Sequence, residues 1–269
     1  MVRAMILAAL AIGSTAVANS PVFLSSQGTT LYRFTTNSVP KTFSVSDDII
    51  GMAADANGVI YVTSSKPGSP PGSELYRLDN PLSNNPTLTL LHGNLSRLYT
   101  SITFINGKLY GVQNLDNFLV EIDLGTFVET PVGATGFMNT NARFGGIGFD
   151  SSAGRLFAVE SQSTNDSLWE IDWSLSNGPN PDASIIGAQG FNNESSGAEW
   201  YNGTLYGVIN NVDTGDYEFG WYDTSTGAFT ATKVLGTSAF INTGLTAIPT
   251  PGSLALLALG GLSLLRRRR

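Results

Sequence analysis

Short acidic clusters are the part of this 269-residue chain best suited to chemistry. They lie at positions 47–48, 165–166 and 213–216. Carboxylate and amide oxygens are the ligands that Ca²⁺ prefers, and two carboxylates can also serve as general acid and base. Each cluster lies in a predicted turn, where Asp and Asn are also expected for backbone reasons alone. The candidate metal ligands are Asp47, Asp48, Asp166, Asp213 and Asp216.

Composition excludes the other common kinds of catalytic site. The chain has one histidine, His92, at the end of the predicted strand 88–91, and it has no cysteine. Ser-His-Asp and Cys-His catalysis and histidine-rich metal sites are therefore excluded. We expect no catalytic residue and no cofactor, with Ca²⁺ as the one ion that the acidic clusters suit.

Three short patterns recur along the chain and indicate how these residues are positioned. The first is a glycine that opens a strand, at positions 58, 107, 154 and 203, with a period of about 48 residues. The second is apolar-x-x-apolar-Asp, which ends at Asp79, Asp123, Asp172 and Asp223. The third precedes the glycines and starts at Gly51, Ser101, Gly146, Gly197 and Gly244. This period is typical of a four-stranded propeller blade.

The two ends of the chain carry the parts of one more blade. Pro21–Ser26, Leu31–Thr35 and Lys41–Val45 supply a second, third and fourth strand, and Gly244–Ile248 supplies a first. The sequence thus predicts an all-β, five-bladed β-propeller closed by a composite N- and C-terminal blade, which leaves no exposed sheet edge. A β-sandwich or an irregular β-solenoid is the alternative, because shared hairpin chemistry can also produce short repeats.

One face of such a propeller is the expected binding face. Turns between second and third strands open there, together with the links between blades, and functional residues favour loops on a rigid scaffold. The four tryptophans fall within predicted strands, so we expect them between blades rather than as a sugar-stacking platform. The face would collect residues 64–72, 113–117, 160–166 and 210–216, with linkers carrying Asp47, Asp48, Arg143 and Glu194.

The charge balance argues against a nucleic-acid partner. Five of the 14 basic residues lie in the segments 1–18 and 249–269, which contain no acidic residue. The remainder has nine basic and 21 acidic residues, a net charge of −12. An acidic body of this kind repels the phosphate backbone. Its length suffices for one domain with a large core and no disulfide.

The first 18 residues resemble a secretory leader in their layout. A basic residue, Arg3, precedes the apolar run Ala4–Ile12, and small residues stand at Ala16 and Ala18. This order is typical of a cleavable signal peptide, and we expect cleavage after Ala18. The domain that follows, residues 19–248, is therefore predicted to be exported.

The last 21 residues predict a short apolar helix. Residues 252–265 carry no charge, and Arg266, Arg267, Arg268 and Arg269 follow them. A helix that is apolar on every face must be buried in protein or placed in lipid, and the arginines would remain on the cytoplasmic side. Fourteen residues cover about 21 Å, less than the roughly 30 Å of a bilayer core, so the anchor would be weak and temporary. A buried C-terminal core helix is the alternative.

The tail resembles a known sorting signal. Pro249 and Pro251, the apolar stretch and the terminal arginines follow in the order of the PEP-CTERM signal of bacteria that make exopolysaccharide, with Thr250 where that family has glutamate. The match covers about 22 residues. The resemblance implies that an exosortase-like membrane enzyme removes the tail and releases the protein or attaches it at the cell surface.

Two classes of function remain on this evidence. The first is a non-enzymatic protein of the cell surface or extracellular matrix, associated with exopolysaccharide and transiently anchored in the cytoplasmic membrane. The second is a calcium-assisted hydrolase, or a lactonase-like propeller, that works through carboxylates at the mouth of the channel. Three or more convergent carboxylate or amide side chains at the channel would favour the second class.

Overall fold

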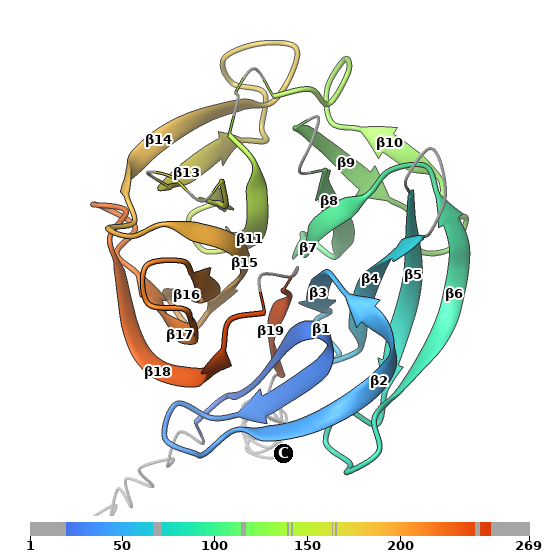
Figure 1. The fold of residues 1–269 in the computed structure, drawn as a ribbon. Helices are drawn as coiled ribbons and strands as arrows, with labels where there is room; N and C mark the ends of the chain where they lie inside the picture. Colours follow the sequence, from blue (N-terminus) through green and yellow to red (C-terminus); the bar gives the residue numbers. More distant parts are fainter. Residues whose placement is uncertain are drawn as a thin grey trace, which may run out of the picture. The chain divides into compact units, whose positions relative to one another are not determined.

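Five antiparallel sheets form a ring in the computed structural model, which confirms the predicted all-β, five-bladed propeller (Figure 1). It describes residues 20–66, 72–113, 117–138, 140, 142–162, 164, 166–239 and 243–248. The predicted signal peptide and C-terminal helix lie outside these residues. Within them, no helix is long and apolar enough to cross a membrane.

Four blades each come from one stretch of chain, with strands in sequence order from the centre outward. Blade 2 contains β3 (Gly51–Ala54), β4 (Ile60–Lys66), β5 (Gly72–Asp79) and β6 (Thr87–Leu95). Blade 3 contains β7 (Tyr99–Ile105), β8 (Lys108–Gln113), β9 (Phe118–Ile122) and β10 (Glu129–Pro131). Blade 4 contains β11 (Phe144–Asp150), β12 (Arg155–Glu160), β13 (Ser167–Asp172) and β14 (Asp182–Ala188). Blade 5 contains β15 (Asn193–Tyr201), β16 (Thr204–Asn211), β17 (Asp216–Tyr222) and β18 (Phe229–Thr237).

The fifth sheet, the seam blade, joins the two ends of the domain. It contains β19 (Leu245–Ile248), β1 (Val22–Phe34) and β2 (Lys41–Ile49). β19 pairs antiparallel with the start of β1, where Val22 lies opposite Ile248. The end of β1 pairs with β2, where Arg33 lies opposite Lys41. The predicted pairing of the two chain ends is therefore confirmed.

β1 folds back on itself at Gly28, whose φ of 59° suits glycine. The rings of Phe23 and Phe34 lie 5.9 Å apart, centre to centre. In a straight strand these residues would be separated by about 36 Å. The two arms of β1 are thus the second and third strands that the sequence predicts for this blade.

The innermost strands approach each other closely at one level of the ring. An ideal Cβ on Gly51 would lie 3.2 Å from the Ser101 Cα, and one on Gly197 would lie 2.8 Å from the Gly244 carbonyl carbon. The hydroxyl of Ser101 accepts a hydrogen bond from the Ile147 N–H at 2.8 Å. Small residues at the start of the third pattern therefore let neighbouring strand backbones pack together.

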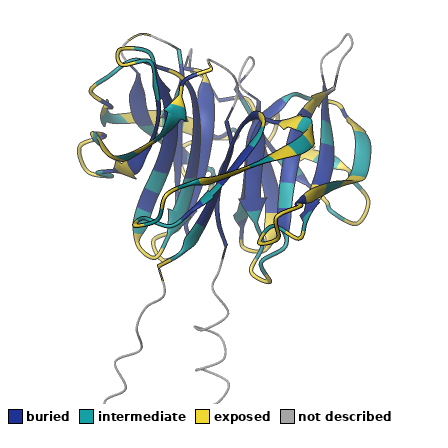
Figure 2. Ribbon diagram, turned by 60° about the horizontal axis from the view of Figure 1, so that its bottom comes forward, coloured by how far each residue is buried: buried dark blue, intermediate teal, exposed yellow. Residues whose placement is uncertain are grey.

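Hydrophobic residues fill the spaces between blades, and the exposed residues lie on the turns and outer strands (Figure 2). At the seam, Phe23 of β1 packs against Phe219 of β17, with ring centres 4.9 Å apart. Trp200 stacks on Phe157 of the preceding blade, as expected for a tryptophan between blades. The expectation is wrong for Trp221, which lies opposite Tyr206 on the other face of the blade 5 sheet and is 38% exposed.

Candidate functional site

The predicted binding face is held together by hydrogen bonds between its turns and linkers. The Ser161 N–H donates to the Arg143 carbonyl at 2.8 Å, and the Val212 N–H donates to the Asn192 carbonyl at 2.9 Å. The Ser238 N–H donates to the Gly215 carbonyl at 2.9 Å. These bonds tie the turns between the second and third strands of blades 4 and 5 to the linkers beside them. We call this end of the ring the linker face.

Asp166 is the most deeply buried acidic group of the linker face, with 1% of its surface exposed. One carboxylate oxygen accepts the Gln162 N–H at 2.7 Å, and the other accepts the Asn193 N–H at 2.5 Å. Burial raises the pKa of Asp166 to about 6, although the two N–H groups favour the charged form. The carboxylate thus fastens the turn after β12 to the first residue of β15.

Glu160 lies beside Asp166 and fixes the start of β13. Its carboxylate accepts the Trp169 indole N–H at 2.9 Å, the Ser167 N–H at 3.1 Å and the Gln162 side-chain amide at 2.8 Å. All of these donors belong to the same blade. The bonds give Glu160 a structural role that the sequence patterns did not indicate.

Asp213 reaches the residue before β15 from blade 5. It accepts the Asn192 N–H at 3.0 Å and the Asn192 side-chain amide at 2.9 Å. Asp166 and Asp213 therefore hold consecutive residues, Asn193 at the start of β15 and Asn192 just before it, and the negative charge of Asp213 contributes to the raised pKa of Asp166. The predicted linker position of Glu194 is wrong, because β15 has already begun there. Asp216 begins β17, where its N–H donates to the Thr214 hydroxyl at 3.2 Å.

The predicted linker position of Asp47 and Asp48 is wrong. Both lie within β2, the outermost strand of the seam blade, whose residues alternate between partly buried and exposed. Asp47 accepts the Ser46 hydroxyl at 2.6 Å. Polar residues suit an outer strand because one of its edges faces water. An acidic pair is therefore compatible with an outer strand as well as with a turn.

The candidate ligands do not converge on one point. Asp166 and Asp213 meet at residues 192–193, whereas Asp47 and Asp48 lie on the seam blade. In the described part of the chain, no group of three or more His, Cys, Asp or Glu side chains is arranged to hold a metal ion. Asn165 lies outside the described residues.

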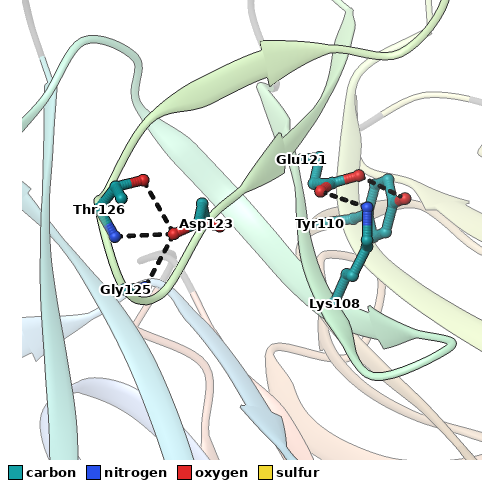
Figure 3. A network of polar contacts seen from close by, with 6 residues as sticks. All are labelled: Lys108, Tyr110, Glu121, Asp123, Gly125 and Thr126. Atoms are coloured by element: carbon teal, nitrogen blue, oxygen red, sulfur yellow. Dashed lines mark hydrogen bonds and ion pairs between the residues drawn. The ribbon is translucent and has the colours of Figure 1, made fainter.

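The aspartates that end the second pattern lie at the opposite end of the ring, and three of the four, Asp123, Asp172 and Asp223, close turns. The fourth, Asp79, accepts hydrogen bonds from the Arg77 and Thr89 side chains instead. Asp123 accepts the Gly125 N–H at 2.9 Å and both the N–H and the hydroxyl of Thr126, at 2.7 and 2.8 Å (Figure 3). These bonds, led by the hydroxyl, lower the pKa of Asp123. In the same view the Glu121 carboxylate accepts hydrogen bonds from the Lys108 ammonium group at 2.8 Å and from the Tyr110 hydroxyl at 3.0 Å. We call this end the hairpin face.

Glu199 is the acidic residue that sequence reasoning missed. It lies on β15 at the third position of the third pattern, where the other blades have Ala53, Thr103, Gly148 and Thr246. Its side chain faces Thr246 of the closing strand β19, and burial raises the pKa of its carboxyl to about 8. The Thr246 hydroxyl is fully buried, and among the residues that the structure describes it has no partner in hydrogen-bonding geometry. The sequence offers one signal for this residue: a carboxylate at a pattern position where the other copies have small, uncharged residues.

His92 has a packing role. It lies in β6, and its ring stacks on Phe127 of the next blade at 4.8 Å between ring centres. A flat stack of this kind between outer parts of two blades needs no proton transfer. The stack accounts for His92 as a contact between blades 2 and 3.

Known proteins resemble the chain in fold. No protein-family model and no curated protein sequence matches it. A chain of a crystallised nidogen/laminin complex matches with a TM-score of 0.54 and 13% identity, over 85% of this chain and 98% of its own length. The likeness is one of fold.

Two further solved structures are more distant. A protein assigned as TolB from Agrobacterium tumefaciens has a TM-score of 0.48 at 13% identity, over 86% of this chain and 87% of its own. A protein assigned as an oxidoreductase (glucose dehydrogenase) from Thermus thermophilus has a TM-score of 0.47 at 14% identity, over 79% of each chain. At these values neither carries an argument about activity.

Proposed function

We propose that the chain is an exported, non-enzymatic protein of the bacterial cell surface or extracellular matrix, sorted by its C-terminal segment. The observation that carries this proposal is the order of features at the two ends. A leader with Ala16 and Ala18 precedes the propeller, and Pro249, Pro251, an apolar stretch and Arg266–Arg269 follow it. The resemblance of this tail to the PEP-CTERM signal makes an exosortase-like membrane enzyme its processing partner.

The position of the chain ends in the propeller supports the proposal. Val22 pairs with Ile248, so the leader and the tail join the domain at one place. This place is at the opposite end of the first arm of β1 from Gly28 and the linker face. A domain tethered at the hairpin face keeps its linker face available to the surroundings.

The linker face suits weak binding of hydroxyl-rich polysaccharide. Asp213 is exposed there, beside the half-buried Asn192, and both groups can exchange their mutual hydrogen bonds for bonds to hydroxyl groups. The polar groups around Asp166 are already bonded to one another, so little interaction energy remains for a ligand. Several modest polar contacts of this kind give a low affinity for each site.

The test is the mass of the mature protein from the producing cells. We expect a species that begins after Ala18 and lacks Arg266–Arg269, because both end segments are sorting signals rather than parts of the domain. Recovery of a cell-surface protein with Met1 or Arg269 still present would contradict the proposal.

A charge-reversal variant separates sorting from folding. Replacing the four arginines by glutamate removes the charges that hold the tail on the cytoplasmic side, so the tail should stay uncut. Thr250→Glu is the matched control, since it restores the residue that the family has and should leave cleavage intact or increase it. Equal processing of both variants would show that this tail is not the signal.

A further inference from the structure

The turn between the third and fourth strands of the seam blade, which we call the seam corner, is closed by cations where blades 3, 4 and 5 use an aspartate. Thr35 takes the place of Asp in the fifth copy of the second pattern. The Lys233 ammonium donates to the carbonyl oxygens of Thr35, at 2.7 Å, and Ser38, at 2.5 Å. The Arg33 guanidinium donates to the carbonyl of Ser83 at 2.7 Å. The positive charges at this corner are thus held by backbone carbonyls.

These charges are not offset by salt bridges. In the described residues the ion pairs are Arg77–Asp79, Lys108–Glu121 and Arg155–Glu170, none of which lies on the seam blade. Lys41, next to Arg33 in the sheet, is exposed. A body with a net charge of −12 therefore carries a local positive area at this corner.

Apolar side chains stand beside the cations. Val39 is 85% exposed and Leu82 is 56% exposed. They line, with Val22, Phe34, Arg33 and Lys41, a hollow of about 330 Å³. We call Arg33, Val39, Lys41, Leu82 and Lys233 the seam patch. Cations around exposed aliphatic side chains are the combination that binds the interface of an anionic bilayer.

The tail brings the seam patch close to a membrane, a step that rests on the proposed function. The described chain ends at Ile248, opposite Val22, which lines the hollow. The uncharged stretch begins at Gly252, four residues later. Four residues span at most about 14 Å even when fully extended. If the apolar stretch is in the bilayer, the corner that carries the patch lies at the level of the lipid headgroups.

We propose that the seam patch binds the anionic phospholipid surface of the membrane that holds the tail. Arg33, Lys41 and Lys233 face the lipid phosphates, and Val39 and Leu82 enter the interface. The contact orients the propeller with its linker face away from the lipid. It also places the Pro249–Pro251 segment at the membrane surface, where a membrane enzyme can reach it.

The absence of cysteine allows a specific test with the full chain. Val39→Cys carries an environment-sensitive dye at the patch, and Ile185→Cys, on β14 and 61% exposed, carries it elsewhere as the matched control. Each protein is reconstituted into vesicles of phosphatidylcholine alone and into vesicles that also contain phosphatidylglycerol. We expect a blue shift and protection from an aqueous quencher at position 39 only, and only with the anionic lipid.

Lys41→Glu tests the electrostatic part of the contact. Each basic residue near an anionic surface contributes about 1 kcal/mol, equivalent to about a fivefold change in partition. The substitution removes one cation and adds an anion, so the ratio of protected to unprotected protein at position 39 should fall more than about fivefold. An unchanged ratio, or an equal shift in both kinds of vesicle, would overturn recognition of the anionic surface.

Flotation of the vesicles separates this inference from the proposed function. Flotation with both lipids but no shift at position 39 overturns the seam patch and leaves the anchor standing. Flotation only with anionic lipid, with the shift, supports the patch and contradicts the anchor. Absence of flotation with both lipids overturns both proposals.

Discussion

The seam blade and the four continuous blades turn the same corner with different chemistry. In three of the continuous blades, an aspartate accepts backbone N–H groups of the turn that follows: Asp123, Asp172 and Asp223. At the seam, the Ser38 hydroxyl accepts the Thr35 N–H at 2.7 Å and Lys233 binds the carbonyls. The acidic cap thus occurs in three continuous blades, whereas the turn beside the two ends of the domain is closed by a hydroxyl and an ammonium group.

The largest effect is expected from opening the seam. Ending the chain after Ser238 removes β19, whose four residues are at most 8% exposed. Burial of each large aliphatic side chain is worth about 1.5–3 kcal/mol, and a domain has only about 5–15 kcal/mol to lose. We expect the truncated protein to lose its cooperative thermal transition, measured by circular dichroism.

A second truncation is the control for this experiment. Ending the chain after Pro249 removes the tail and keeps β19 in place, so its unfolding midpoint should equal that of the full chain. If both truncated proteins unfold alike, the pairing of Val22 with Ile248 does not hold the ring closed.

The next effect concerns the acid that faces the closing strand. The pKa of Glu199 is about 8 in the folded protein because of burial, and about 4.3 is usual in an unfolded chain. Between these values the folded state keeps a proton that the unfolded state has lost. Stability should therefore fall as pH rises from about 5 to 8, by up to about 1.4 kcal/mol per pH unit. Urea denaturation at several pH values measures this slope.

Glu199→Gln should flatten the slope and stabilise the protein by up to about 5 kcal/mol at pH 9 relative to the parent chain. Glu194→Gln, an exposed position on the same strand, should leave the slope unchanged. Asp166, with its pKa raised to about 6, adds a similar decline between about pH 4 and 6 in all three proteins. The same slope in the parent and in Glu199→Gln would show that Glu199 is not buried at the seam.

The smallest effect distinguishes the two kinds of corner directly. Asp123→Ala removes the acceptor of two backbone N–H groups, whereas Thr35→Ala leaves the Ser38 and Lys233 contacts in place. We expect the thermal midpoint to fall by about 2 °C for Asp123→Ala and by less for Thr35→Ala. Because bonding lowers the pKa of Asp123, its contribution should disappear as pH falls below about 4. A larger loss from Thr35→Ala would contradict the comparison.

Repetition made the fold predictable. The fifth copies at Leu31–Thr35 and Gly244–Ile248 lack partners within their own ends of the chain, so each had to complete the other. The closeness of the inner strands was not predictable in the same way. A small residue at the start of a strand can serve a turn, a bulge or close packing. The close approach of Gly197 to Gly244 in the structure shows that here it serves close packing of two strands.

The site was harder to predict because burial depends on distant strands. Glu199 is polar in a strand of mixed character, and it becomes a buried acid only when β19 lies beside it. The pair Asp47-Asp48 was placed in a linker because acidic doublets favour turns, yet an outer strand accommodates them as well. The mutual arrangement of Asp166 and Asp213 depends on residues 192–193, which no sequence pattern marks.

The pairing of β1 with β19 also sets the order in which the domain can be completed. The two strands are separated by about 220 residues, so at roughly 10 residues per second about 20 s pass between the synthesis of the first and the last. During this interval the inner edge of β1 has no partner from its own chain. Copies that mature side by side can donate β19 to one another, and a domain-swapped dimer joined at the seam is the misassembly that this architecture favours.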